Sequence, residues 1–310
     1  MNVSVCMCTY NGNKYIRGQL LSIYQQTRKP DEVIICDDGS DDGTVSVIEE
    51  FIRKRNLEDK WKVIVNSENV GYLRNFYNAT AMCHGDIIFF ADQDDVWHYD
   101  KIEKMCEVFD HHPEAKVVCC KFDLIDSGGD KISGIMVPVR SGESGDVKPV
   151  AIESFFRKHE WPAMVIAFRR SWYENWKDIT KDSMIPHDYL FCSKAAEEEG
   201  FLQLDLKLAY HRLHKNNVAK EESKISVLLD KKRKLSEIDE YMGILESFEQ
   251  EKVLHSPESL SALSKKKDIM TRRRDALTSG KLGKVISNGI KDRHSVRMKT
   301  VICDLLIVKQ

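Results

Sequence analysis

DIIFFADQDDVW, residues 86–97, decides the fold, because a short apolar run is followed at once by three carboxylates within four residues. The apolar part has the length and composition of a buried β-strand. Neighbouring carboxylates repel one another, and folding alone gains nothing from concentrating them. We therefore interpret the stretch as a strand whose carboxyl end belongs to a ligand site. A solvated acidic turn is the alternative.

On both sides of this strand, short apolar runs alternate with segments of helical pattern. Further strands are predicted at VSVCMCT (3–9), EVIICDD (32–38) and WKVIVN (61–66), and helices near 13–26, 43–55, 73–82 and 98–110. This alternation indicates βαβ units and a largely parallel sheet, which binds ligands at the carboxyl ends of its strands. The polar clusters Thr9–Gly12, Asp37–Ser40 and Asp92–Asp95 are therefore predicted to converge on one site.

The second half of the chain continues this pattern and then changes. Strands are predicted at 116–125, 162–170 and within 202–218, and helices near 150–158 and 186–199. Pro186 and Gly200 are the opening and closing residues expected of that last helix. From residue 221 onward, helix formers rich in Lys, Glu and Leu replace the strands. We predict an α/β domain over residues 1–218 and a basic helical region over residues 219–310.

Composition favours a globular cytoplasmic protein. The mean hydropathy is -0.41, and the chain has no apolar run of the roughly 18 residues that a membrane span requires. The N-terminus lacks a basic flank and a cleavage site, so no export is expected. The nine cysteines are odd in number, form no CxxC pair and lie largely in apolar runs. We interpret them as buried free thiols in a reducing compartment.

Charge is divided unevenly along the chain. The net charge is -2, but residues 220–310 hold 20 Lys+Arg against 14 Asp+Glu, which leaves 27 and 35 for the rest. The basic runs at 265–267 and 272–274 are interpreted first as ordinary solvated helix faces, and the apolar segment at 300–308 is too short to span a bilayer. Peripheral contact with an anionic inner leaflet is the alternative. Nucleic acid is not expected, because the region lacks interleaved aromatic residues.

The polar clusters have the chemistry of a nucleotide site. The carboxylates of 92–95 are hard oxygen ligands that suit Mg²⁺ or Mn²⁺, and a diphosphate would supply further oxygens. Tyr10 could stack on a base. Asp38, which precedes Gly39, could accept a hydrogen bond from a base or a ribose hydroxyl. A tight turn and a helix cap explain part of the second cluster equally well.

Four spaced motifs, CTYNG (8–12), CDDGSDDGT (36–44), NVGYLRNF (69–76) and FFADQDDVW (89–97), together resemble the nucleotide-binding half of family 2 glycosyltransferases, which have the GT-A fold. The resemblance covers about residues 1–217. It implies a nucleotide-sugar site formed by Thr9, Tyr10, Asn11, Asp38, Arg74, Asn75, Asp94 and Arg212. The metal ligands that it implies come from Asp92, Asp94, Asp95 and His214. Asp95 is the first candidate, and which of the three aspartates binds metal stays open.

Two downstream segments extend the resemblance. IPHDYL (185–190) resembles the segment that holds the family's catalytic base, with Asp188 at the matching position, although an aspartate at a helix start is also an ordinary cap. His187 is interpreted as a helix-surface residue. HRLHKNNV (211–218) is similar to the family's ending, but His211 stands where tyrosine is usual. His214 is either a ligand in the metal or diphosphate shell or a structural histidine.

The resemblance implies a metal-dependent, inverting glycosyltransferase. Its donor would be a nucleotide diphosphate sugar, and its acceptor a glycan or a lipid-linked molecule in bacterial surface polysaccharide assembly. A noncatalytic nucleotide-sugar binding module is one alternative. A sugar-phosphate nucleotidyltransferase is another, but it would begin with a Gly-rich basic loop, which CTYNGNKY (8–15) is not.

Overall fold

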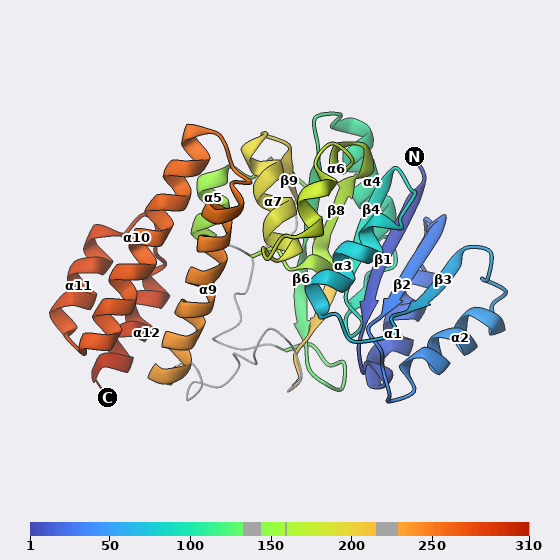
Figure 1. Ribbon diagram of the computed structural model, residues 1–310, viewed down its shortest axis with the longest axis horizontal. Coiled ribbons are helices and arrows are strands. Elements are labelled where there is room, and N and C mark those ends of the chain that lie inside the picture. Colours follow the sequence, from blue (N-terminus) through green and yellow to red (C-terminus); the bar gives the residue numbers. More distant parts are fainter. Residues whose placement is uncertain (133–143, 159, 215–228, 310) are drawn as a thin grey trace. The chain divides into compact units, whose positions relative to one another are not determined.

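The computed structural model describes residues 1–132, 144–158, 160–214 and 229–309. Two compact units are present (Figure 1): residues 1–150 with 160–214, and residues 151–159 with 215–310. The boundary predicted near residue 218 lies outside the described residues. The helix predicted near 150–158 belongs to the second unit by its contacts.

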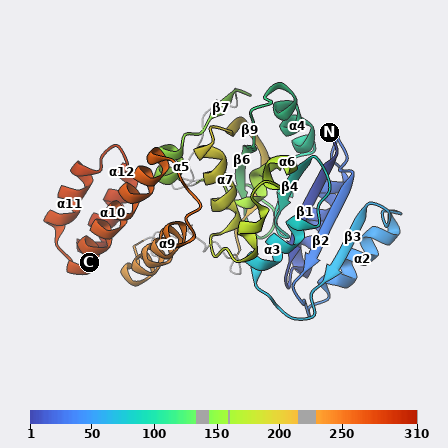
Figure 2. The same ribbon diagram turned by 45° about the horizontal axis from the view of Figure 1, so that its top comes forward.

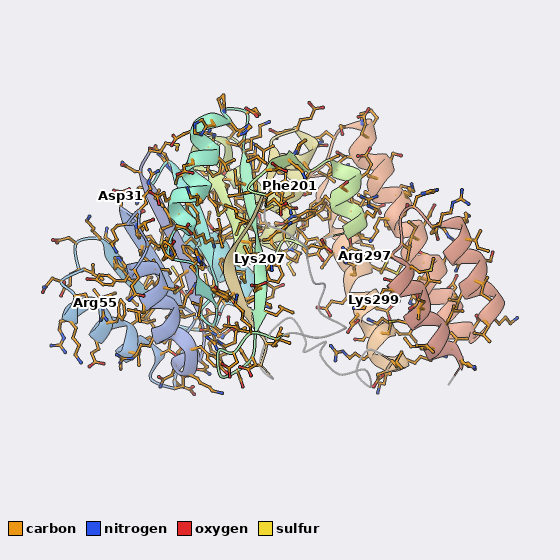
Figure 3. The ribbon with its side chains drawn as sticks, turned by 180° about the vertical axis from the view of Figure 1, so that it is seen from behind. Asp31, Arg55, Phe201, Lys207, Arg297 and Lys299 are labelled. Carbon is orange, nitrogen blue, oxygen red and sulfur yellow. The ribbon has the colours of Figure 1, made fainter. Side chains whose placement is uncertain are left out.

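The first unit is built on a single nine-stranded sheet. Its strands run in the order β3-β2-β1-β4-β8-β6-β9-β5, and β7 pairs with β9. The bounds are Val3–Thr9 (β1), Glu32–Asp37 (β2), Trp61–Val65 (β3), Ile87–Ala91 (β4), Val96–Trp97 (β5), Val117–Ile125 (β6), Val147–Pro149 (β7), Ile166–Arg169 (β8) and Phe201–Arg212 (β9). Figure 3 marks Phe201 and Lys207 on the long last strand.

The sheet has a parallel half and a mixed half. Strands β1 to β4 are parallel to their neighbours in this group, whereas β8 runs antiparallel between β4 and β6. The central strands β1 and β4 are buried along their whole length, as apolar runs covered on both faces should be. The prediction of an α/β protein with a mostly parallel sheet is confirmed.

Helices flank this sheet (Figure 2). They are Asn13–Tyr24 (α1), Thr44–Lys54 (α2), Tyr72–Ala81 (α3), Lys101–His111 (α4), Arg170–Tyr173 (α6) and His187–Glu197 (α7), with 3₁₀ turns at Ala163–Val165 and Lys177–Lys181. Just before α2, the Asp42 carboxylate accepts from Thr44 N at 3.0 Å, which satisfies a backbone donor at the start of the helix. Gly43 precedes it with φ 90°, a conformation that glycine adopts readily.

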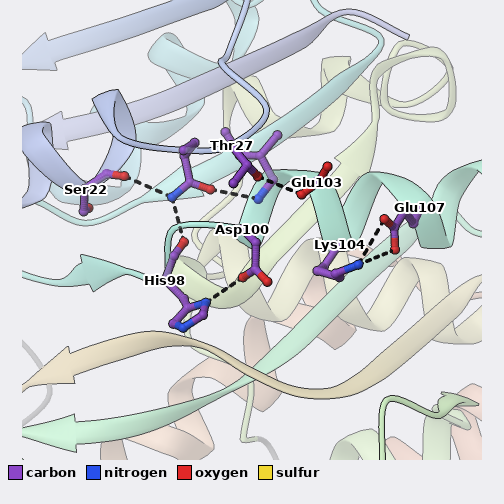
Figure 4. Close-up of polar contacts among 9 residues, drawn as sticks. Ser22, Thr27, His98, Asp100, Glu103, Lys104 and Glu107 are labelled. Atoms are coloured by element: carbon purple, nitrogen blue, oxygen red, sulfur yellow. Dashed lines mark hydrogen bonds and ion pairs between the residues drawn. The ribbon is translucent and has the colours of Figure 1, made fainter.

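A polar network fastens the segment after the acidic cluster to the end of α1 (Figure 4). The Gln26 amide donates to Ser22 O at 3.0 Å and to His98 O at 2.7 Å. Its oxygen accepts from Ile102 N at 3.0 Å, which satisfies a backbone donor at the start of α4. Thr27 adds a hydrogen bond of 2.8 Å to Glu103. The chain that follows the acidic residues, from His98 to Glu103, is therefore attached to the end of α1.

The second unit is helical, as predicted. It contains Ile152–Lys158 (α5), Lys231–Glu251 (α9), Pro257–Ser279 (α10), Leu282–Lys291 (α11) and Met298–Lys309 (α12). Ser256 caps α10 by accepting from Ser259 N at 3.1 Å, and Gly280 ends it with φ 63°. A connection at residues 292–297 joins α11 to α12.

Two expectations from composition can be compared with the structure. All nine cysteines are free thiols, and eight are buried, as interpreted from the sequence. Among the helices of the described ranges, none combines the length and the apolar composition needed to cross a membrane.

Candidate active site

The loops that follow β1, β2 and β4 meet at one edge of the sheet, as the sequence predicted. Thr9 at the end of β1 pairs in register with Asp37 at the end of β2, and β4 pairs with the other side of β1. Tyr10 N donates to the Gln93 side chain at 2.9 Å, and the Gln93 amide donates back to Tyr10 O at 3.0 Å. The first and third clusters are thus joined directly.

The first loop combines fixed residues with one exposed ring. Thr9 is buried and donates to the Asp37 carboxylate at 2.6 Å, so its hydroxyl serves the fold. Asn11 has φ 48° and accepts from Asp41 N at 3.1 Å. Tyr10 is 49% exposed. Of the three residues predicted here, Tyr10 has the surface that a base could stack on.

The Asp38 carboxylate is largely occupied by the protein itself. Asp38 is buried, and its Oδ1 accepts from Val70 N at 2.9 Å and from the Asn66 amide at 2.8 Å. Its Oδ2 accepts from Gly71 N at 2.9 Å. These bonds hold the segment before α3 at the end of β2. An ionised carboxylate has about four acceptor positions, so these bonds use most of those on Asp38.

Arg74 and Asn75 are adjacent on α3 but have different surroundings. Asn75 is buried, donates to Cys36 O at 2.9 Å and accepts from Asn66 at 3.0 Å, so it fastens α3 to β2. Arg74 is exposed, and within the described residues no hydrogen bond or ion pair holds its guanidinium group. Arg74 therefore keeps its charge available to an anionic ligand, whereas the neutral amide of Asn75 is bonded within the fold.

The carboxylates of the third cluster are crowded. Asp92 and Asp94 are half-buried and Asp95 is fully buried. Burial, followed by the charges of Asp95 and Asp94, raises the pKa of Asp92 well above its usual range. Burial and Asp95 also raise the pKa of Asp94, although His214 opposes this. The protein alone therefore does not compensate the negative charge that it gathers here.

Asp95 is bound on one oxygen only. Its Oδ1 accepts from Arg212 N at 2.9 Å and is 3.0 Å from His211 Nδ1, whereas its Oδ2 is buried with no hydrogen-bond partner in the described structure. Burial alone would lower the pKa of His211, but Asp95, with Asp92 and Asp94, raises it to about 9. An unpartnered buried oxygen on a carboxylate is costly, and a cation would relieve that cost.

The end of β9 and the residues after it contact the carboxylate cluster. His214 Nε2 is 2.7 Å from Asp94 Oδ2, and its ring packs against Tyr15 with centroids 4.6 Å apart. The Arg212 guanidinium donates to Asp94 O at 2.8 Å and to Asp126 O at 3.1 Å. The structure thus brings the predicted residues Asp94, Asp95, Arg212 and His214 together.

The residues present fit a divalent cation. Within the described residues, no group of three His, Cys, Asp or Glu side chains is already arranged around a common centre. The unpartnered oxygen of Asp95 and the raised pKa of Asp92 are nevertheless what a shell of hard oxygen donors should display without its ion.

Asp188 lies in the first turn of α7. Its charge contributes to raising the pKa of Asp92, and its Oδ1 accepts from Tyr189 N at 3.0 Å. Asp188 is half-buried. A half-buried carboxylate whose charge acts on Asp92 therefore lies at the start of α7.

The interpretation of His187 as a surface residue was wrong. His187 is buried, its ring stacks on Phe76 with centroids 4.0 Å apart, and neither ring nitrogen has a hydrogen-bond partner in the described structure. Burial lowers the pKa of His187 to about 4, so the ring is neutral. It packs as an aromatic side chain behind Asp188.

Residues 4–144 match the model of the family described as Glycosyl transferase family 2. The match covers 141 of the 310 residues, and over this region the chain is similar to glycosyl transferase family 2. The matched range contains the Tyr10 loop, Asp38, α3 and the carboxylate cluster. It ends before Asp188, His211 and His214.

Curated relatives carry glycosyltransferase names. An uncharacterized glycosyltransferase of Nostoc sp. is 29% identical over 228 residues, which cover 70% of this chain and 66% of that protein. A Bacillus subtilis glycosyltransferase named for teichuronic acid biosynthesis, TuaG, is 32% identical over 105 residues, or 34% of this chain and 40% of that protein. The chain thus spans less than two thirds of the length of these relatives.

Solved structures share the fold. TarS 1-349 of S. aureus in complex with UDP aligns with a TM-score of 0.57 at 19% identity, over 91% of this chain and 92% of that one. A mannosyltransferase of Pyrobaculum calidifontis, solved with GDP-Man and Mn²⁺, aligns with a TM-score of 0.52 at 15% identity, over 99% and 85%. The chain therefore has the GT-A fold that its motifs predict.

Sequence reasoning missed two cations of this site. His211 was noted only as a departure from the usual tyrosine, yet it faces Asp95. Lys101 is fully buried at the start of α4, donates to Met164 O and lies 3.7 Å from the centroid of the Trp97 ring. Burial lowers the pKa of Lys101 to about 8, although Cys120, Asp95 and Asp92 oppose this. A lysine six residues after the carboxylate cluster was the available signal for the second.

Proposed function

We propose that the chain transfers a sugar from a nucleotide diphosphate donor to a hydroxyl group of an acceptor, with inversion at the anomeric carbon. The observation that carries the proposal is the crowded cluster of Asp92, Asp94 and Asp95, with one buried oxygen unpartnered, beside the exposed Tyr10 ring. The match to the family model supports the reaction class. The UDP and GDP-Man in the similar structures support a nucleotide-bound donor.

A divalent cation, Mn²⁺ or Mg²⁺, belongs to this proposal. Asp95 and Asp92 would hold it, with Asp94 and His214 as further donors. Once bound, such an ion neutralises charge on a diphosphate. The Mn²⁺ recorded with the similar mannosyltransferase supports the assignment.

The contacts proposed for the nucleotide-sugar donor use the side chains at the site that are not fully used in bonds within the protein. Tyr10 stacks on the base, and Asp38 accepts a hydrogen bond from the base. Arg74 supplies an exposed positive charge to the diphosphate. Thr9, Asn11 and Asn75 shape the pocket through their bonds to the protein, and Arg212 positions Asp94 by holding its carbonyl oxygen.

Asp188 is proposed as the general base. The acceptor oxygen forms a bond to the anomeric carbon, the bond from that carbon to the diphosphate oxygen breaks, and the hydroxyl proton passes to the Asp188 carboxylate. The donor's electron pair leaves with the nucleoside diphosphate, so no covalent sugar intermediate on the protein is needed. Positioning of the two substrates supplies much of the remaining acceleration.

The proposed acceptor is a glycan or a lipid-linked molecule of a bacterial surface polysaccharide. The teichuronic acid name of one relative supports this class. Lipid-linked acceptors are held at a membrane, so we place the chain in the cytoplasm with a peripheral position on the inner face of the cell membrane.

Thermal unfolding in the presence of nucleotide sugars tests the proposal. A panel of UDP- and GDP-sugars should raise the unfolding temperature of the full chain, and Mn²⁺ should enlarge the effect, because a ligand that binds only the folded state stabilises it. Single-turnover transfer with the best donor then separates an enzyme from a binding module. Stabilisation without turnover on any glycan or lipid-linked acceptor would favour the binding module.

A further inference from the structure

Two arginines of the basic run 272–274 form ion pairs inside the second unit. Arg272 donates to Asp292 at 2.7 Å, and the side chain of Asp292 is only 8% exposed. Arg273 binds Asp304 with both a 2.6 Å and a 2.9 Å hydrogen bond. These pairs tie α10 to the connection after α11 and to α12. Most of the 272–274 run is therefore used inside the unit, and the membrane contact that the sequence leaves as an alternative needs another surface.

Helices α11 and α12 each expose an apolar stripe. On each helix, three large apolar side chains are spaced four residues apart, so they share one side of the helix. They are between 43% and 72% exposed, which is unusual for side chains of this size when they occur in rows. We call them the apolar hairpin face: Leu282, Ile286, Ile290, Met298, Ile302 and Leu306.

The two stripes lie on one side of the hairpin. The helices approach at Gly289, where an added Cβ would lie 2.8 Å from the Val301 side chain, and Val285 and Asp304 line the same cavity. Contacts in this order describe antiparallel neighbours. At about 100° per residue, both stripes then fall on the same side of the line of contact. The buried side chains of Val285, Asp304 and Ile307 fall on the other side, toward α10.

Outward charge on this hairpin is entirely positive. Residues 281–309 are all described and contain two acidic side chains, Asp292 and Asp304, both buried and both paired with arginine. The basic side chains of the same range are exposed (Figure 3 labels two of them): Lys281, Lys284, Lys291, Arg293, Arg297, Lys299 and Lys309. On α12, Lys299 and Lys309 lie beside the stripe, and the lysines of α11 lie on the side of that helix opposite its stripe. An apolar face with positive charge beside and behind it is complementary to a lipid surface that carries negative head groups.

We propose that the apolar hairpin face inserts among the head groups of a membrane that contains anionic lipid, with α11 and α12 lying in the plane of the surface. A second copy of the chain is a poorer occupant, because two such faces would bring like charges together. The inference extends the peripheral location proposed above. Its test reads vesicle binding alone, so its failure and the failure of the transfer reaction are distinguishable.

The test is flotation of the full chain with vesicles of phosphatidylcholine alone and of phosphatidylcholine mixed with phosphatidylglycerol. The unaltered chain should float with the mixed vesicles. The double variant Ile286→Ser/Ile302→Ser should bind the mixed vesicles at least about tenfold more weakly, because it no longer transfers two apolar side chains from water into the lipid. Leu260→Ser is the matched control, since Leu260 is equally exposed on α10 but lies outside the face. It should bind as the unaltered chain does.

A second variant keeps the test valid if the double variant does not fold. Ile302→Trp keeps an apolar side chain on the face, and its fluorescence should shift to the blue with mixed vesicles, whereas Leu260→Trp should not respond. The proposal is overturned if the unaltered chain does not float, if the double variant floats equally well, or if Ile302→Trp shows no shift. It is also overturned if a concentration-dependent dimer forms that the double variant abolishes, because the face would then belong to a second copy.

Discussion

Asp304 in the second unit and Asp95 in the first are both buried, yet their surroundings are opposite. Both oxygens of Asp304 accept hydrogen bonds from Arg273. At Asp95, one oxygen receives both available donors and the other receives none. The first carboxylate is complete within the fold, and the second is complete only when something else binds.

The difference in hydrogen-bond partners indicates that Asp304 stabilises the fold and that Asp95 is placed to bind a ligand. Removing a carboxylate from water is costly unless partners replace the lost hydration. In the second unit the sequence supplies a guanidinium group for each buried aspartate of the hairpin. In the first unit, three aspartates are gathered within four residues, and the raised pKa of Asp92 records the cost. A fold under no functional demand would avoid that arrangement.

The largest expected effect comes from Asp188→Asn. This variant tests whether the Asp188 carboxylate contributes to the rate of sugar transfer rather than to the stability of the fold. The amide keeps the size but cannot take the acceptor proton, so single-turnover transfer should fall by about 10² to 10⁴, roughly 3 to 5 kcal/mol of barrier. Donor affinity and the unfolding temperature should stay unchanged. Asp178→Asn, on an exposed turn, is the control. A loss smaller than about threefold would leave Asp188 as a helix-start residue only.

Asp304→Ala should have the reverse outcome. Leaving the Arg273 guanidinium buried without its partner should cost about 3 to 5 kcal/mol of unfolding free energy, measured by urea titration of the full chain. Donor binding should persist in the folded fraction. Asp239→Ala is matched to it, because Asp239 pairs with the neighbouring Arg274 in an exposed position and should change stability little. Equal losses in the two variants would contradict the contrast drawn here.

Asp95→Asn sharpens the comparison further. The amide oxygen can still accept from Arg212 N, so the fold should survive, but the second carboxylate oxygen is gone. Stabilisation by a nucleotide sugar with Mn²⁺ should be largely lost, up to about 2.7 kcal/mol at a ligand concentration near one hundred times its dissociation constant. Differential scanning fluorimetry with and without Mn²⁺ measures this. Asp86→Asn, at the opposite end of β4, should retain the full effect.

His187 gives the smallest of these effects, through pH. Its pKa is about 4 in the folded chain against an ordinary 6.5, so the unfolded chain binds more protons between these values and stability falls as pH falls. Between about pH 7 and pH 5 the loss should be about 2 kcal/mol. His187→Phe should remove this slope, as urea titrations at both pH values would detect. An unchanged slope in the variant would assign the titration to another group.

Sequence patterns predicted individual strands and helices. They did not predict contacts between residues that are far apart in the chain and are brought together by strand pairing. Strand β1 was predicted with its observed bounds, because a buried parallel strand is a continuous apolar run. Strand β5 has two residues and no pattern of its own, yet its pairing with Tyr210 and Ala209 sets Asp95 beside His211. His187 was misjudged because α7 is buried on nearly all sides, so no amphipathic period marks its inner face.

The candidate site divides in the same way. The motifs located the carboxylates, Tyr10, Asp38 and Asp188 along the chain, but motif position does not say which polar groups are already used. Asn75 and Thr9 bond to the protein, and Arg74 stays exposed, for reasons that lie in the packing of α3 on β2. The basic runs of the second unit likewise gave no sign that their partners were Asp292 and Asp304, 20 and 31 residues away.

The pairing of β5 with β9 has a consequence for biosynthesis. Asp95 and His211 are 116 residues apart in the chain, so the ribosome releases the carboxylate cluster long before the groups that complete its surroundings. Strands β1 to β4 can pair with one another during that interval, because their partners have already been made. The nascent chain should therefore acquire its nucleotide-facing sheet edge first. The contacts of Asp95 with His211 and Arg212 should form only once β9 has been synthesised.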